Sequence, residues 1–412
     1  MKTTYLLLCL LGIGSVSGAG QTKQPQKIGD FIESTSYNEH RRMPPEACNI
    51  PLTETILSCI NGKNRFTRAL YGSHTAFRLE TSDRPVFAAY TKENPKHICF
   101  KLQTSGGTVA LDSTEHCESR YTAGRRSYSL SDPAFGGGSL SITTWALPDK
   151  EGAIWQFNAR NFKEFHPVLL ASISEIRNSK LNRNGDMGAD PADSFEAPLQ
   201  PQQLQSFPVQ IDGTLYILLE NQELRTLTTA EGENLFKKAE AARSETASRI
   251  RIETPDPYFN TLGGTLAMAA DGIWDGEVWL HGAIGWRMPL SGWRAAYTGD
   301  VLGWHDRART HFNAYAASQV TEVPNTLPHP AQDSALHLAR SVKKWGTPQY
   351  SNGYICRNPH RNNQMHHYDM NLCYIDELVM AFQVDGGLGL CPPNVACHHP
   401  SPRMGKAELR PG

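Results

Sequence analysis

The chain has 412 residues, and its 40 lysines and arginines against 41 aspartates and glutamates give a formal net charge of −1. Hydrophobic residues make up 39% of the sequence, which is enough for sizeable cores and argues against disorder. The near-neutral balance gives no electrostatic reason to bind nucleic acid or an anionic membrane, because such partners select a concentrated basic face. The composition therefore favours an uncharged or locally recognised ligand.

The first 20 residues have the layout of a cleavable secretory signal. A single lysine precedes an apolar run of about a dozen residues, and small residues follow as far as Gly20. The run is shorter than the roughly 20 apolar residues that cross a bilayer. We therefore expect removal of residues 1–20, no membrane insertion afterwards, and a periplasmic or secreted location.

Eight of the nine cysteines follow this signal, and an exported protein can form disulfides. The plausible pairs are Cys48 with Cys59 and Cys99 with Cys117. The Cys-x-x-Cys spacing that is typical of zinc ligands does not occur. We therefore expect no bound metal and no cofactor.

Residues 60–220 carry short runs of alternating apolar and polar residues, separated by Gly, Pro, Asn and Asp. These runs predict strands at residues 75–81, 85–91, 97–103, 140–147, 153–159 and 214–220. A period of two with turn residues between the runs favours an antiparallel β-sandwich. We assign residues 21–225 to this domain.

A change of period from two to about 3.6 marks a second domain. Residues 226–255 are rich in strong helix formers with charges on all sides, which favours an exposed linker helix. Three further helices are predicted from apolar side chains that share a face. These faces are Phe259, Leu262 and Leu266 in the first helix, Trp304, Ala308, Phe312 and Tyr315 in the second, and Tyr368, Leu372, Ile375 and Val379 in the third.

Long loops rich in glycine and aromatic residues separate these helices. Loops that hold the polar and aromatic residues are typical of a toroid of helical hairpins with a site at one mouth. The expected fold class is therefore multidomain β + α, an N-terminal antiparallel β-sandwich followed by a partial (α/α)6 toroid. Residues 256–379 would form the first part of that toroid.

The segment 272–309 concentrates aromatic and charged side chains. It holds five of the eight tryptophans, namely Trp274, Trp279, Trp286, Trp293 and Trp304. Carboxylates, guanidinium groups and histidines are interleaved with them, and core packing alone does not explain that mixture. A sugar site needs flat apolar surfaces for the ring faces, bidentate partners for the hydroxyls and carboxylates for bond cleavage. The segment supplies each of these parts.

A second group of polar side chains lies on the helix predicted near residue 370. It comprises His366, His367, Asp369, Asp376 and Glu377. The helical spacing keeps Asp369 and Glu377 from pointing easily into one pocket. We therefore assign Asp369, near the helix start, to the site, and we interpret Asp376 and Glu377 as solvated or structurally paired.

A sandwich followed by "GWRMPLSGWRAAYTGDVLGWHDRAR" and "GYICRNPHRNNQMHHYDMNLCYIDEL" resembles the six-hairpin glycosidase superfamily. The likeness is to the secreted glycan-degrading enzymes of saccharolytic Gram-negative bacteria, and it covers the mature chain up to Leu378. It implies a glycoside hydrolase that acts on terminal or side-chain sugars of a complex polysaccharide. Two carboxylates would serve as general acid and as general base or nucleophile.

The resemblance places the loop after the first toroid helix and the starts of later helices around the substrate. The catalytic candidates are Asp300, Asp306 and Asp369. The substrate-binding candidates are Trp286, Trp293, Arg294, Trp304, His305, His366 and His367. Because the superfamily shares no single catalytic pair, the acid and the base stay unassigned.

Residues 380–412 follow neither the helical nor the strand period. A ring of six hairpins also needs more helices than the chain after residue 255 can hold. Reading one base later turns Met380 and Met404 into tryptophans and continues the tryptophan-rich helical pattern. We interpret residues 380–412 as an out-of-frame tail on a truncated enzyme. Such an enzyme can lack one of its two carboxylates, and it exposes apolar helix faces. The alternative is an irregular natural terminus.

Two other functions fit the same residues. A polysaccharide lyase would use Tyr297, His305 and Arg307 against a uronate carboxylate and would form an unsaturated product that absorbs ultraviolet light. A non-catalytic glycan-binding protein would use the tryptophans only for stacking. In every case the expected partner is a polysaccharide or oligosaccharide, with no nucleic acid partner.

Overall fold

The computed structural model describes residues 56–64, 67–72, 77–91, 95–162, 166–176, 195, 204–255, 257–282, 289, 296–319, 331–333, 338–340, 353, 355–356, 358–360 and 368–385. The expected signal at residues 1–20 and the tail beyond residue 385 lie outside these ranges. Within them, no helix combines the length and the apolar character that crossing a membrane requires.

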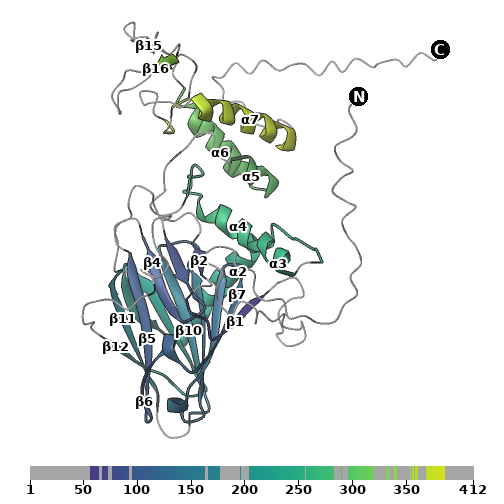
Figure 1. Ribbon diagram of the computed structural model, residues 1–412. Coiled ribbons are helices and arrows are strands. Elements are labelled where there is room, and N and C mark those ends of the chain that lie inside the picture. The colour runs from purple at the N-terminus through teal and green to yellow at the C-terminus, as the bar shows by residue number, and fades with distance from the viewer. Residues whose placement is uncertain are drawn as a thin grey trace, which may run out of the picture.

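Two antiparallel sheets form the first part of the protein (Figure 1). Sheet A has the strand order β1 (Leu57–Ile60), β7 (His116–Thr122), β8 (Arg125–Ser131), β9 (Ser139–Ala146), β10 (Gly152–Arg160), β13 (Thr214–Glu220) and β14 (Glu223–Leu227). Sheet B has the order β12 (Gln205–Pro208), β11 (Val168–Glu175), β5 (Lys96–Thr104), β4 (Val86–Tyr90), β3 (Arg78–Thr81) and β2 (Arg68–Tyr71), with β6 (Gly107–Ala110) also paired to β5. The six predicted runs correspond to β3, β4, β5, β9, β10 and β13, so those strands are confirmed.

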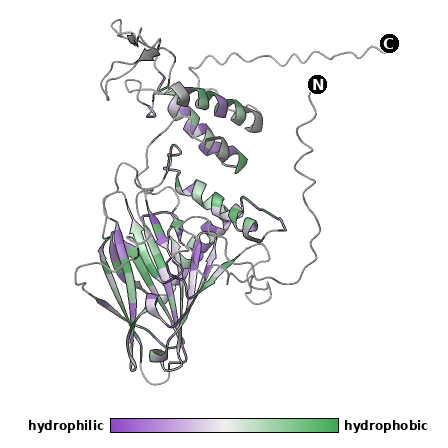
Figure 2. Cartoon of the chain, viewed as in Figure 1, coloured by the Kyte–Doolittle hydropathy of each residue, from purple (hydrophilic) through white to green (hydrophobic). Residues whose placement is uncertain are grey.

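The main core lies between the two sheets. Alternate residues of each strand face inward, and Figure 2 shows hydrophobic and hydrophilic bands along the strands. Trp155 of β10 is fully buried and meets Phe87 and Phe100 of sheet B edge to face, with ring centroids 5.4 and 5.7 Å apart. Phe157, two residues further along β10, contacts Phe100 at 5.1 Å. These edge contacts join the sheets into one sandwich.

Helix α2 (Thr229–Ala247) is the helix predicted at the end of the sandwich, and its presence is confirmed. A capping box formed by Thr228 and Glu231 fixes its start. Its Ala239 packs with Trp145 and neighbouring apolar side chains on the outer face of sheet A. The helix is therefore docked on the sandwich and is more than an exposed linker.

The remaining described helices are α3 (Pro257–Asn260), α4 (Leu262–Gly272), α5 (Ala296–Val301), α6 (His305–Ala316) and α7 (Tyr368–Asp385). In the described part of the chain they do not form a ring of hairpins, so the expectation of a partial (α/α)6 toroid was wrong and the fold is mainly β. The described residues between the helices include turns, isolated bridges and a short hairpin of β15 (Ala331–Asp333) and β16 (Leu338–Arg340). Helices α5, α6 and α7 pack against one another (Figure 1).

Helix α6 buries the face that the sequence predicts, because Trp304, Ala308, Phe312 and Tyr315 are all buried. Helix α4 does not. Its predicted apolar face is exposed: Phe259 of α3 is 57% exposed, and Leu262 and Leu266 of α4 are 39% and 54% exposed.

The inward face of α4 has small residues where it approaches the rest of the chain most closely. A Cβ on Gly263 would come within 2.6 Å of the carbonyl oxygen of Ile250, so only glycine permits this close approach to the chain that follows α2. Ala267 and Met268 are buried on the same side of the helix. The closeness of the backbones, rather than side-chain hydrophobicity, therefore decides which face is buried.

Helix α7 also turns its predicted face outward. Leu372, Ile375 and Val379 are 70%, 57% and 50% exposed, whereas Tyr374 and Ala381 are buried. The helix ends at Asp385, beyond the end at Val379 that the sequence indicated. The exposed apolar side chains were expected for a truncated ring, but here they belong to a helix of a mainly β protein.

The expected disulfide between Cys99 and Cys117 was wrong, because both thiols are unbridged. The strand register explains the difference: Cys117 belongs to β7 of sheet A and faces the core, while Cys99 belongs to β5 of sheet B and faces outward. Burial raises the pKa of the Cys117 thiol to about 12, so it is not a reactive group at neutral pH. Cys48 lies outside the described residues.

Candidate functional site

A tight turn joins α5 to α6 and sets the geometry of the candidate site. Gly303 has a φ of 76°, in the left-handed region that favours glycine. Its N–H donates to the carbonyl oxygen of Asp300 at 2.9 Å, and the N–H of Trp304 donates to that of Gly299 at 2.7 Å. These two bonds form the Schellman motif that ends a helix. The turn therefore brings the end of α5 beside the start of α6.

Asp300 and His305 form a hydrogen-bonded pair across this turn. Nδ1 of His305 lies 2.8 Å from Oδ1 of Asp300. The Asp300 side chain is 1% exposed and that of His305 is 40% exposed. An ionised aspartate accepts from Nδ1–H, which leaves Nε2 as the ring nitrogen that can exchange a proton. The pair can hold the imidazole in one tautomer and one orientation, as general acid–base catalysis requires.

The ring system of Trp304 packs against two guanidinium groups. Cζ of Arg307 lies 4.3 Å and Cζ of Arg249 lies 5.0 Å from the centre of its ring system. Nη1 of Arg307 also donates to Oδ1 of Asp271 at 2.7 Å, and the Asp271 side chain is 1% exposed. Trp304 itself is 7% exposed, so it serves packing and cation–π contacts and offers no open face to a sugar.

The other described tryptophans of this segment are buried as well. Trp274 and Trp279 are 4% and 2% exposed, and their rings lie 4.7 Å apart at an angle of 57°. Trp286 and Trp293 lie outside the described residues. Within the described residues, the tryptophan-rich segment therefore presents no indole on which a sugar could stack.

The predicted catalytic carboxylate of Asp306 is not brought to the pair. Asp306 lies in the first turn of α6, but its side chain is 95% exposed and pairs with Arg309. Asp369 lies in the first turn of α7, and its side chain is outside the described residues. The candidates Arg294, His366 and His367 lie entirely outside the described residues. Asp300, Trp304 and His305 are thus the predicted residues that the structure places together.

Two buried polar side chains on helices α6 and α7 were not assigned to the site from the sequence. His311 of α6 accepts the N–H of Trp279 at Nδ1, at 3.1 Å. Glu377 of α7 is 4% exposed and shares the buried face of its helix with Tyr374. The signal was available, because Glu377 stands three residues after Tyr374, but the sequence assigned the apolar face of α7 to the wrong side.

His360 and Glu277 form a second histidine–carboxylate pair. Nε2 of His360 is 2.6 Å from Oε1 of Glu277, and the two side chains are 53% and 48% exposed. Asp275 holds the loop by accepting the N–H groups of Glu277 and Val278 at 3.0 and 2.8 Å. Because both partners are solvated, their coupling is weaker than that of Asp300 with His305.

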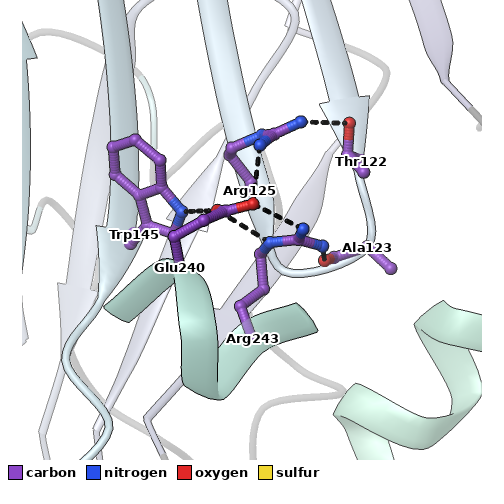
Figure 3. Close-up of polar contacts among 6 residues, drawn as sticks. All are labelled: Thr122, Ala123, Arg125, Trp145, Glu240 and Arg243. Atoms are coloured by element: carbon purple, nitrogen blue, oxygen red, sulfur yellow. Dashed lines mark hydrogen bonds and ion pairs between the residues drawn. The ribbon is translucent and has the colours of Figure 1, made fainter. Parts of the chain in front are cut away.

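The densest polar cluster fastens α2 to sheet A (Figure 3). Oε1 of Glu240 accepts from Arg125 at 2.8 Å and from Arg243 at 2.7 Å. Oε2 accepts from the indole of Trp145 at 2.6 Å and from Arg243 at 2.9 Å. Arg243 also donates to the carbonyl oxygen of Ala123 at 2.8 Å. The bonds from Arg125 and Trp145 and the bond to Ala123 join the helix to the sheet, so the cluster is structural.

Acid should loosen this cluster. Burial alone would raise the pKa of Glu240, but the hydrogen bonds and charges of Arg243 and Arg125 outweigh it and leave that pKa below its usual value. The stabilisation is then complete above the ordinary glutamate pKa and is lost as the pH falls through the lowered pKa of the folded state. Thermal unfolding followed from neutral to acid pH should show a steeper loss of stability in the wild type than in Glu240→Gln; parallel curves would contradict this.

Among the described residues, no group of three or more histidine, cysteine or acidic side chains is arranged to hold a metal ion.

Residues 95–249 are similar to a domain of unknown function, the DUF4450 domain. That stretch runs from β5 to the end of α2, so it includes the docked helix and excludes the helices that carry Asp300 and His305. No curated protein matches the chain significantly.

Proposed function

We propose that the protein is a glycan-cleaving enzyme, a glycoside hydrolase, in which Asp300 and His305 perform the proton transfer. The supporting observation is the 2.8 Å hydrogen bond between a buried carboxylate and a half-exposed imidazole. Such a pair can protonate a departing glycosidic oxygen or take a proton from an attacking water. The glycan substrate itself rests on the resemblance of residues 285–309 and 353–378 to six-hairpin glycosidases.

Hydrolysis by this route needs a second acidic group on the other side of the bond. Among the predicted carboxylates, Asp306 points into solvent and pairs with Arg309, which argues against it. Asp369, in the first turn of α7, is the remaining candidate for this role. The secreted or periplasmic location, with a polysaccharide or oligosaccharide as the partner, belongs to the same proposal.

A polysaccharide lyase is the second candidate function. It is favoured by one observation, namely that the described pair joins a histidine to a carboxylate and not two carboxylates to each other. A histidine with a carboxylate behind it can remove the proton next to a uronate carboxyl group, and β-elimination then breaks the glycosidic bond.

Product chemistry separates these functions. The purified full chain should be incubated with aryl glycosides, neutral polysaccharides and uronate-containing polysaccharides, while reducing ends and ultraviolet absorbance are both recorded. A hydrolase is expected to release reducing ends without an absorbance rise, and a lyase is expected to give both together. Absence of product from every substrate would overturn both enzymatic proposals and favour a glycan-binding protein.

A further inference from the structure

The outer face of sheet A is divided into two halves. Helix α2 covers one half, where Glu240 meets Arg125 and Trp145. The other half, around the end of β8 and the start of β9, holds an open groove of about 440 Å³. Its polar lining comes from four strands, with His116 of β7, serines of β8 and β9, and Asn158 and Arg160 of β10.

The outermost row of the groove has a basic side chain at each end. Strand register pairs His116 with Ser131 on one side of the row and Ser139 with Arg160 on the other. His116 and Arg160 are both exposed, and neither has an ion-pair partner within the described part of the chain. Three strand spacings, about 14 Å, separate them. A ligand lying across the strands can therefore meet a basic group at both ends.

The next row supplies hydroxyl and amide groups. Ser129 of β8 pairs with Ser141 of β9, which pairs with Asn158 of β10. Oδ1 of Asn158 accepts the hydroxyl of Thr214 at 2.8 Å, which orients the amide with its NH2 group as a donor. The serines are small, and each hydroxyl both donates and accepts. This floor suits a ligand that carries many hydroxyl groups of its own.

Arg160 gives the residues that line the groove a positive formal charge. None of the described residues that line it is acidic. The carboxylate of Glu118, in the second row, pairs with Arg120 at 3.0 Å. Asp132, which follows β8, accepts two backbone N–H groups at 3.0 and 3.1 Å. Arg120 therefore balances the charge of Glu118, whereas Asp132 keeps its charge but does not line the groove, so Arg160 is the charged group that a ligand in the groove meets directly.

We propose that this groove is a docking site for an anionic glycan, a sugar chain that carries sulfate or carboxylate groups. The hydroxyl and amide rows match the sugar hydroxyls, and the basic groups at the ends of the outer row match the acidic substituents. The near-neutral net charge of the chain argues against a nucleic acid at the same place. The proposal concerns binding on the sandwich and stands independently of the chemistry of His305.

Dextran sulfate and neutral dextran of equal length are the probes, titrated calorimetrically into the full chain. Dextran sulfate should bind and neutral dextran should not, and added salt should weaken the binding because exposed charges are screened. Arg160→Gln should weaken binding about tenfold, as expected for loss of one charge-assisted contact. Ser129→Glu, which places a negative charge on the exposed floor, should abolish it.

Arg225→Gln is the matched control, because Arg225 is also an exposed arginine of sheet A but lies on β14, away from the groove. Its binding of dextran sulfate should equal that of the wild type. Equal losses in Arg160→Gln and Arg225→Gln would show diffuse charge attraction and overturn the docking site, as would no binding or equal binding of neutral dextran. Cleavage of a small aryl glycoside by Arg160→Gln should be unchanged, so this test and that of the proposed catalysis fail separately.

Discussion

Replacement of Glu240 by alanine is expected to lower the free energy of unfolding by about 3 kcal/mol. The substitution removes the carboxylate that neutralises the guanidinium group of Arg243, whose side chain is 3% exposed. It also removes the acceptor for the indole N–H of Trp145 and the counter-ion of Arg125. A buried charge that loses its counter-ion retains its desolvation cost, so the effect exceeds that of an ordinary surface pair. Denaturant unfolding monitored by tryptophan fluorescence measures the change.

Glu233→Ala provides the matched control on the same helix. Glu233 pairs with Lys237 at 3.9 Å, and their side chains are 53% and 75% exposed. Such an exposed pair contributes about 0.5 kcal/mol or less. If Glu233→Ala and Glu240→Ala lowered stability equally, the docking role of the Glu240 cluster would be refuted.

The strands of the sandwich were predictable because a two-residue period is a local property of the sequence. The six predicted runs became strands, and Trp155 and Phe157 of one run lie in the core as alternation requires. The arrangement of the helices was not predictable from period, and the expected toroid was wrong, because a helical repeat shows which residues share a face and not which helices pair. Helix α4 shows this limit, since close backbone contact at Gly263 turned Leu262 and Leu266 outward.

The candidate site was predictable in part. Asp300 and His305 were both chosen from the sequence, and Gly303 between them is the signal for the helix-ending turn that joins them. Trp304 was assigned to a sugar surface, but its contact with Arg307, three residues further along α6, makes it a packing residue. The Glu240 cluster was not predicted, because its partners Arg125 and Trp145 lie 115 and 95 residues away in the chain.

The second large effect is expected for Asp300→Asn. The substitution keeps the shape of the buried side chain but replaces the carboxylate acceptor, and the new amide can orient so that it donates to Nδ1 and holds the wrong tautomer. We expect turnover of the cleaved glycan to fall by roughly 10²–10⁴-fold, the range of general acid–base catalysis. Because the side chain is nearly isosteric, the unfolding midpoint should change little by comparison.

The most direct test of the catalytic pair is the turnover rate of wild type, Asp300→Asn and Glu277→Gln on the glycan that the product screen identifies. Glu277 is the matched control, because it also bonds a histidine, His360, but in an exposed setting. The catalytic role predicts that Asp300→Asn, folded as the wild type, loses nearly all turnover while Glu277→Gln retains it. Wild-type turnover in a folded Asp300→Asn variant would contradict the catalytic role of Asp300 and His305.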